Sequence, residues 1–452
     1  MLTVTLSHSY RPEREYIVDV LLGEFLGLNY QIQFQPRDCV NISDGNGNSL
    51  QIADILFQTR DKYWLTEKSL PSIPLVQFNQ SKVNVVDKIT AHNVPVIFGN
   101  HRKINPSDSY IPIDIFGSSF FLLSRYEEYV SSEKDRHLRF PASASIAFQN
   151  GFLDRPIVNE YLEILWVHMK RLWPGLKRKP RVFRLLSTHD VDIPFAFLGR
   201  SFSKILFQSA VDVYHGHDFR QILDNFFQWR KVTRTECDDP FDTFDWMMQI
   251  AEKVGINTCF NFMSGGRLPI DYYYPIKGYH IQKLIQKIIR RGHEIGFHPS
   301  YQTVLDGGRW KSEFERFSAA ISGFRVRGGR QHFLRFNAPA TWRYWADNSL
   351  EYDSTLGFAD HAGFRCGTCY EYPVYDLENR HELNLRERPL IAMDTSIIDD
   401  NYMGMGPTEV AVDYLLELKR RCRYYNGDFV LLWHNQRFVD PREKEIYRTV
   451  IG

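Results

Sequence analysis

Short polar runs follow apolar stretches at three places in the second half of the 452-residue chain. Each apolar stretch has the length of a buried strand, and each polar run carries aspartate or histidine. The polar runs are Thr188-His189-Asp190-Val191-Asp192 after 182–187, His298-Pro299-Ser300-Tyr301 after 294–297, and His434-Asn435 after 429–433. If the stretches are parallel strands of a barrel, their carboxyl ends gather at one face, so these side chains are predicted to converge.

Asp190 and Asp192 suit metal-assisted hydrolysis because residues i and i+2 of a strand point to the same side. One carboxylate can then bind a cation while the other acts on water. Together with imidazole ligands, such a carboxylate forms an open zinc site that brings the pKa of water towards neutrality. The plainer alternative is that both acids cap a helix that follows the strand.

Two histidines flank the stretch at 294–297. His298 follows it and is predicted to be at the active face, where it is either a metal ligand or a hydrogen-bonding residue. His293 precedes the stretch, so it is predicted to lie at the opposite face and is not a candidate ligand.

The segment at 330–342, between the polar runs, is too polar for a plain core strand and too apolar for a loop. A buried arginine normally has an acidic partner, and Asp190 is the natural candidate for Arg335. A surface ion pair is the alternative for Arg335.

Strand-length apolar runs alternate with helical patterns after residue 180. The apolar runs include 182–186, 259–263 and 429–433, and the helical patterns include 219–232, 246–254, 281–290 and 410–421. This alternation favours parallel strands with crossover helices, and an α/β barrel is the simplest fold that fits it.

The first 175 residues have a different pattern. Strand-like runs at 3–6, 83–86 and 95–98 accompany a Gly/Asn turn at 44–48, and a helix is predicted over 157–172 with Pro156 at its first position. The helix ends at Trp173-Pro174-Gly175. We therefore predict a small α+β domain over 1–175, a boundary near 173–180, and the barrel domain over 180–452.

The amino-acid composition argues against some classes of binding partner. The 55 Lys and Arg residues nearly balance 54 Asp and Glu residues, so the formal charge is +1 and nothing favours nucleic acid as a partner. No apolar run approaches the roughly 18 residues of a membrane span. The amino terminus lacks a secretory apolar region, and six cysteines are too few for a disulfide framework. We expect a cytoplasmic protein with reduced thiols.

Taken in order, these motifs resemble the NodB-homology polysaccharide deacetylases, carbohydrate esterase family 4, over roughly residues 180–440. They look most like a bacterial subgroup in which this catalytic domain follows an uncharacterised α+β domain, and the segment at 120–128 also resembles that subgroup. The resemblance implies a distorted (β/α)7 barrel and metal-dependent hydrolysis of an N-acetyl or O-acetyl group on a sugar.

The resemblance also implies roles for individual residues. Asp190 matches the catalytic base, Arg335 the arginine that orients the base, and His434 the general acid. Asp192 and His298 match metal ligands, with zinc the expected metal. The residues expected at the substrate are Leu432, Trp433, Pro339, Thr341, Phe364 and Arg365.

One position departs from the family pattern. The family's second metal histidine normally lies four residues after the first, and this chain has Gln302 there. Glutamine is a poor zinc ligand. Either His332 supplies the third ligand, which we favour, or the site binds metal weakly.

The predicted activity is removal of an acetyl group, in the first instance N-acetyl, from a polysaccharide or glycan intermediate. The metal and Asp190 activate water, a backbone N–H near Ala340 or Thr341 helps to hold the oxyanion, and His434 protonates the leaving amine. Asp394 is the candidate carboxylate partner of His434, with a turn or cap role as the equal alternative.

Three other functions remain open at this point. A glycosidase would use paired carboxylates such as Asp190 and Asp394 and need no metal. A sugar-binding or assembly protein could retain the barrel after losing the histidine at position 302. A metal-dependent hydrolase could act on a non-sugar amide.

Overall fold

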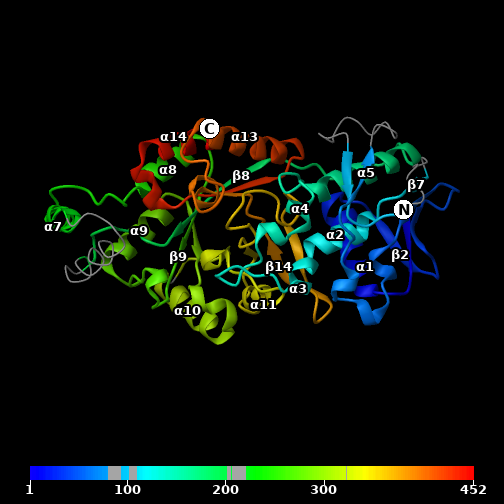
Figure 1. Cartoon of the computed structure of the whole chain (residues 1–452), viewed down its shortest axis with the longest axis horizontal. Helices are drawn as coiled ribbons and strands as arrows, with labels where there is room; N and C mark the ends of the chain where they lie inside the picture. Colours follow the sequence, from blue (N-terminus) through cyan, green and yellow to red (C-terminus); the bar gives the residue numbers. More distant parts are fainter. Residues whose placement is uncertain (80–92, 101–108, 201–204, 206–219, 322) are drawn as a thin grey trace. The chain divides into compact units, whose positions relative to one another are not determined.

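The computed structural model describes residues 1–79, 93–100, 109–200, 205, 220–321 and 323–452 (Figure 1). The chain forms two compact units whose division does not follow chain order. Unit 1 contains Met1–Arg184, Phe333–Gly404 and Tyr414–Val430, and unit 2 contains Leu185–His332, Met405–Asp413 and Leu431–Gly452. The boundary predicted near 173–180 stays a proposal.

The amino-terminal part of unit 1 is built on a five-stranded sheet of order β2-β1-β3-β4-β7. Its strands are β1 (Leu2–Leu6), β2 (Tyr30–Phe34), β3 (Cys39–Ser43), β4 (Ser49–Ala53) and β7 (Tyr110–Ile111). β3 pairs antiparallel with β1 and β4, whereas β1–β2 and β4–β7 are parallel. The turn predicted at 44–48 joins β3 to β4, with the Asn46 N–H donating to Asp44 Oδ1 at 2.8 Å.

Helices and a hairpin complete this part of unit 1. They are α1 (Arg11–Val18), α2 (Ile115–Leu123), α3 (Tyr126–Val130), α4 (Ile146–Gln149), α5 (Ile157–Leu172), β5 (Val76–Asn79) and β6 (Asn93–Val96). The α5 bounds match the prediction, although Pro156 is the N-cap and not the first helical residue. Of the predicted strands, 95–98 overlaps β6, whereas 83–86 lies outside the described residues.

The later segments of unit 1 include an antiparallel pair and several short elements. These are α11 (Ala340–Asp347), β12 (Tyr352–Asp353), β13 (Tyr372–Asp376), β14 (His381–Glu387), β15 (Ala392–Met393) and α12 (Asp394–Ile398). β13 and β14 are antiparallel, and β12 pairs parallel with β14. α13 (Glu409–Tyr424) and β16 (Asp428–Leu432) each have residues in both units.

Unit 2 contains a series of parallel strands, three of which overlap the strands predicted at 182–186, 259–263 and 294–297. β8 (Arg184–Val191), β9 (Cys259–Phe262), β10 (Glu294–Phe297) and β11 (Gly328–Gly329) pair in that order, all parallel. All four β9 residues are buried, which explains its continuous apolar and amide composition. A Cβ on Gly329 would lie 1.9 Å from the Phe297 carbonyl oxygen, so glycine permits the close approach of β10 and β11.

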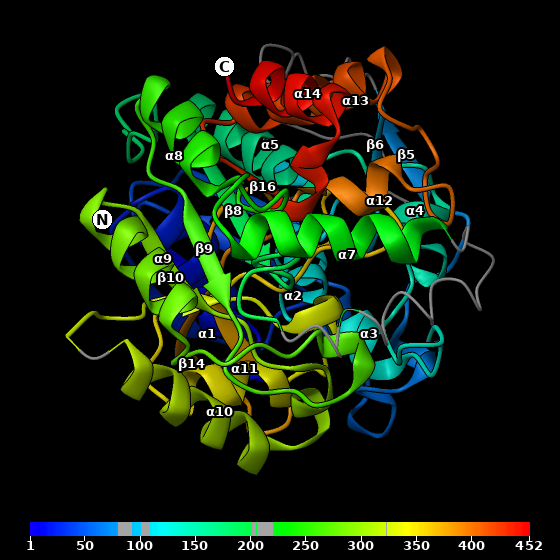
Figure 2. The ribbon, with the colours of Figure 1, turned by 90° about the vertical axis from the view of Figure 1, so that its left-hand side faces the viewer.

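The helices of unit 2 are α7 (Arg220–Thr233), α8 (Phe244–Lys253), α9 (Tyr279–Arg290), α10 (Gly307–Ala320) and α14 (Pro441–Ile451). Figure 2 shows α9 beside β9 and β10, with α8 and α10 to either side of it. The chain is thus mixed α/β with an extended set of parallel strands. The sheets found among the described residues include no closed barrel, so the (β/α)7 barrel stays a proposal. Across the described residues we find no helix with the length and apolar character of a bilayer span.

Candidate metal centre and active site

Asp190 lies near the carboxyl end of β8 and is held by two donors. Its Oδ1 accepts from Asn261 Nδ2 at 2.7 Å and from Arg330 Nη1 at 2.9 Å, and its side chain is buried. Asn261 is the β9 residue that pairs with Asp190 across the sheet, and Gly296 is its β10 neighbour. A Cβ at Gly296 would lie 1.9 Å from Asn261 Oδ1, so glycine leaves the space that Asn261 requires.

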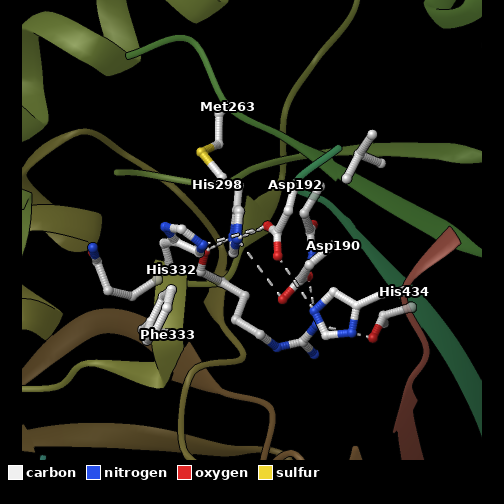
Figure 3. Close-up of polar contacts among 12 residues, drawn as sticks. Asp190, Asp192, Met263, His298, His332, Phe333 and His434 are labelled. Atoms are coloured by element: carbon white, nitrogen blue, oxygen red, sulfur yellow. Dashed lines mark hydrogen bonds and ion pairs between the residues drawn. The ribbon is translucent and has the colours of Figure 1, made fainter. Parts of the chain in front are cut away.

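Asp192, His298 and His332 form a group whose ligand atoms all lie within 4.8 Å of one another. Asp192 Oδ1 lies 3.2 Å from His298 Nε2 and 3.6 Å from His332 Nε2. In Figure 3 both imidazoles point towards the carboxylate of Asp192. One carboxylate and two imidazoles are a ligand set of open catalytic zinc sites, so the donors that the chain brings together fit a divalent cation.

The outer nitrogens of both histidines are engaged. His298 Nδ1 lies 2.5 Å from the Arg330 carbonyl oxygen, and His332 Nδ1 lies 3.2 Å from Asp271 Oδ1. Such contacts fix the orientation and tautomer of a metal-binding histidine and leave the other nitrogen to the metal. Asp271 is itself buried and accepts from the Tyr301 N–H at 2.8 Å. The group is therefore held in place by its surroundings.

The electrostatics keep both aspartates ionised. Burial alone would raise the pKa of Asp192, but His332 and His298 outweigh it and hold that pKa well below the ordinary value. Burial would likewise raise the pKa of Asp190, and Arg330 and His298 lower it overall. Burial lowers the pKa of His332, whereas Asp192 and Asp271 together raise it to about 9. A cation bound between these groups would replace the proton that His332 holds in its absence.

Arg330 and His332, which follow β11, both reach the site. Gln331, between them, points elsewhere: its Nε2 donates to the Ser300 carbonyl at 2.9 Å and to Thr303 Oγ1 at 2.8 Å. His332 begins a short 3-10 segment, His332–Leu334, in which Phe333 has a positive φ of 63°.

Gln302 lies away from this group of ligands. It belongs to a 3-10 turn, Tyr301–Leu305, is exposed, and accepts a hydrogen bond from Arg309 Nη1. The structure therefore brings His332, and not Gln302, to Asp192 and His298. His293 lies at the amino end of β10, where its Nδ1 accepts a hydrogen bond from the Thr258 N–H at 3.1 Å.

His434 reaches the same site from the end of β16. Trp433 N–H donates to the Thr188 carbonyl at 3.0 Å, which places the end of this strand beside β8. His434 Nε2 then lies 3.6 Å from Asp192 Oδ2. Figure 3 shows the imidazole near the carboxylates of Asp190 and Asp192. The three polar runs predicted to converge do so within unit 2.

Arg335 and Asp394, two further predicted catalytic residues, belong to unit 1. Arg335 is buried, and its Nε donates to the His137 carbonyl at 2.9 Å. Asp394 begins α12, and its Oδ1 accepts from the Thr395 N–H at 2.6 Å. The roles of Arg335 towards Asp190 and of Asp394 towards His434 stay predictions.

The residues predicted to contact substrate are almost all buried. Side chains with exposed fractions of at most 3 % are those of Leu432, Trp433, Thr341, Phe364 and Arg365. Arg365 forms a two-point ion pair with Glu128, at 2.8 and 2.6 Å, and also donates to the Gly357 carbonyl. Pro339 is the N-cap of α11. An internal ion pair is the role that the structure shows for Arg365, and substrate contact by this set stays a prediction.

Three residues at the site were not assigned from the sequence. Arg330 could have been found, because the i, i+2 rule that links Asp190 to Asp192 also links Arg330 to His332. Asn261 lies within a predicted strand and carried the signal of a polar residue in an apolar run. Asp271 ends a short 3-10 helix, Pro269–Asp271, and had no signal of its own in the sequence.

Comparison with known proteins finds only weak similarity. Residues 2–174 match the model of a family of unknown function, DUF7033. The comparison with curated proteins gives no match. A Mycobacterium smegmatis protein assigned as a polysaccharide deacetylase is 19% identical over 60% of this chain and 84% of that chain, with a TM-score of 0.39. Puue allantoinase is 12% identical over 62% and 85%, with a TM-score of 0.35. Likeness at this level assigns no activity to the chain.

Proposed function

We propose that this protein is a metal-dependent hydrolase that removes an acetyl group, in the first instance N-acetyl, from a glycan or glycan intermediate. The observation that carries the proposal is the group of Asp192, His298 and His332 directly beside the buried, ionised Asp190. The sequence motifs that resemble polysaccharide deacetylases support the class of substrate. The proposal includes a (β/α)7 barrel over 180–452 behind an accessory domain over 1–175.

Asp192, His298 and His332 would hold the cation, for which zinc fits the donor set. A cation there would polarise an acetyl carbonyl and make a nearby water more acidic. Asp190 is the base that takes the proton of the attacking water, and Arg330 keeps its carboxylate ionised and oriented. His434 is the acid that gives a proton to the leaving amine, and Arg335 and Asp394 support the base and the acid in this scheme.

Metal content per chain tests the ligand set. Elemental analysis of wild-type protein purified without chelator or a histidine tag should give about one metal per chain, and His332→Ala should lose it. Gln302→Ala is the matched control and should retain the metal. Protein that takes up no zinc on loading would remove the basis of the hydrolase mechanism. Retention of metal by His332→Ala with loss in Gln302→Ala would move the third ligand to the glutamine.

Acetate release tests the reaction. Zinc-loaded protein should release acetate from acetylated chitin oligosaccharides, and Asp190→Asn should reduce the rate at least 100-fold with unchanged thermal unfolding. Asp245→Asn, an exposed acid on α8, is the control. New reducing ends without acetate would instead indicate a glycosidase, and turnover of cyclic amides alone would indicate a non-sugar substrate.

A further inference from the structure

Unit 2 has a second concave feature, formed by the loops after β8 and β9 and the start of α9. It is a pocket of about 600 Å³ whose walls include Phe195, Arg200, Arg267, Tyr272, Tyr273 and Tyr279. This volume is in the range of small-molecule sites. None of these side chains belongs to the group of ligands at Asp192.

Aromatic rings on the pocket walls are exposed to an unusual degree. Tyr272, Tyr273 and Tyr279 expose 44%, 50% and 73% of their surface, although large aromatic side chains are mostly buried. Exposed rings gathered in one concavity mark a binding surface. A tyrosine offers an apolar face and a hydroxyl, which together suit a sugar ring with its C–H faces and hydroxyl edges.

In the described part of the chain, no carboxylate oxygen lies within 4.0 Å of the guanidinium nitrogens of the two pocket arginines, Arg200 and Arg267. By contrast, Arg291 at the far end of α9 pairs with Asp245 and Glu252. Unpaired guanidinium groups on a pocket wall are well suited to a phosphate or carboxylate, which they bind at two points.

Asp239 is an acidic residue whose charge raises the pKa of Arg200, but both of its carboxylate oxygens already accept hydrogen bonds. They accept from the N–H groups of Ala196, Phe197 and Leu198 at 2.9, 2.7 and 2.9 Å. Burial lowers the pKa of Arg200, and Asp239 offsets this only in part. Among the described residues, the acid nearest in effect to Arg200 is thus already engaged by backbone N–H groups, which leaves the guanidinium available to an anion.

The pocket wall is continuous with the support of the metal ligands. Tyr274 lines the pocket, and its hydroxyl donates to the carbonyl of Val191, the residue between Asp190 and Asp192, at 2.8 Å. Asp271, which contacts His332, lies between the wall residues Pro269 and Tyr272. The segment 269–274 thus lines the pocket with some of its side chains and contacts the candidate metal group with others.

We propose that this pocket binds an anionic sugar unit of the substrate, a unit that carries a phosphate or a carboxylate. The tyrosines take the ring and the two arginines take the anion. This inference rests on the proposed function, because it places the unit in the same substrate whose acetyl group meets Asp190. It restricts the substrate class from acetylated glycans in general to acidic ones.

Binding measured without hydrolysis tests the pocket by itself. Calorimetry on metal-free Asp190→Asn protein would compare N-acetylglucosamine 1-phosphate and N-acetylmuramic acid with neutral N-acetylglucosamine. At least one of the charged sugars should bind tenfold or more tightly than the neutral sugar, and the stronger of the two identifies the anion. The added substitutions Arg200→Gln and Arg267→Gln should abolish that difference, whereas Arg290→Gln, at the exposed end of α9, should preserve it. Arg267→Gln alone, at an exposed position, should reduce it in a protein with unaltered folding.

Equal binding of charged and neutral sugars, or no effect of the arginine substitutions, would overturn the assignment. Inorganic phosphate is a further probe: if it binds as tightly as the sugar phosphate, the pocket is a free-anion site and the sugar part is wrong. Tyr273→Ala should weaken the binding of the sugar phosphate and leave the binding of inorganic phosphate unchanged. Acetate release from neutral glycans together with no binding of charged sugars would reject the pocket assignment alone. Binding of charged sugars with no metal uptake would instead reject the hydrolase.

Discussion

Asp271 Oδ1 lies 3.2 Å from Nδ1 of His332, one of the three residues of the candidate metal group. Both side chains are buried, and Nε2 of the same imidazole faces Asp192 at 3.6 Å. In a metal-bound state, this contact would orient Nε2 of His332 towards the metal and strengthen that nitrogen as a donor.

Asp271→Asn should weaken metal binding. An amide at this position has no charge to stabilise the polarised imidazole, so the metal affinity is expected to fall about 10- to 100-fold. Competition with a chromophoric chelator measures the dissociation constant. Asp413→Asn, an exposed acid on α13, should leave the affinity unchanged. An unaltered affinity in Asp271→Asn would mean that His332 does not bind the metal.

Arg330→Gln should move the acid limb of the pH–rate profile to higher pH. Arg330 lowers the pKa of Asp190 against the effect of burial, so its removal lets that pKa rise and keeps the base protonated over more of the acidic range. The loss of kcat/KM should therefore be larger at pH 5.5 than at pH 8. Arg330→Lys should restore part of the shift, and thermal unfolding separates this effect from misfolding. A uniform loss at every pH would indicate a purely structural role for Arg330.

Gly296→Ala should disturb Asp190 through Asn261. The new methyl group would meet Asn261 Oδ1 at 1.9 Å, so the amide must shift, and we expect this to weaken its 2.7 Å hydrogen bond to Asp190. Overpacking of this kind costs about 1–3 kcal/mol of folding free energy. Denaturant unfolding and acetate release measure both effects. Gly308→Ala on α10, where the new Cβ finds its nearest neighbour at 3.5 Å, is the control and should be close to neutral. Equal behaviour of the two variants would rule out a steric role for Gly296.

Because of Glu128, the free energy of unfolding should depend on pH in the acidic range. Burial raises its pKa, but Arg125 and Arg365 outweigh burial and bring it to about 2. Because the folded pKa is depressed, this stabilisation is complete above about pH 4.5 and is lost as the pH falls towards 2. A pKa shift of this size corresponds to about 3 kcal/mol of folding free energy at neutral pH.

Glu128→Gln is the variant that isolates this contribution. It leaves two buried guanidinium groups without their shared carboxylate and should cost about 3–5 kcal/mol at pH 7. The difference from wild type in denaturant unfolding should shrink between pH 4.5 and pH 2. Glu133→Gln, an exposed neighbour, should show neither effect. A difference that does not change with pH would show that Glu128 acts by packing and not by charge.

Local pattern was sufficient for several elements and for part of the site. The helix at Ile157–Leu172 and the strand at Glu294–Phe297 follow from apolar periodicity and from the turn residues beside them. The positions of Asp192 and His298 follow from the rule that polar residues after parallel strands share one face. The preference for His332 over Gln302 came from the family resemblance, whose pattern places a histidine at position 302, together with the poor affinity of glutamine for zinc.

Tertiary structure alone decided which partners these residues have. That Arg330 meets Asp190, and that Asp271 meets His332, depends on the pairing of β8 with β9 and of β9 with β10, and on the path of a segment far away in sequence. The two compact units also interleave segments that are distant along the chain. Sequence periodicity predicts which face of an element a side chain occupies, because this depends on a few neighbouring residues. It does not predict strand register or the path of a loop, because these are set by the packing of the whole fold.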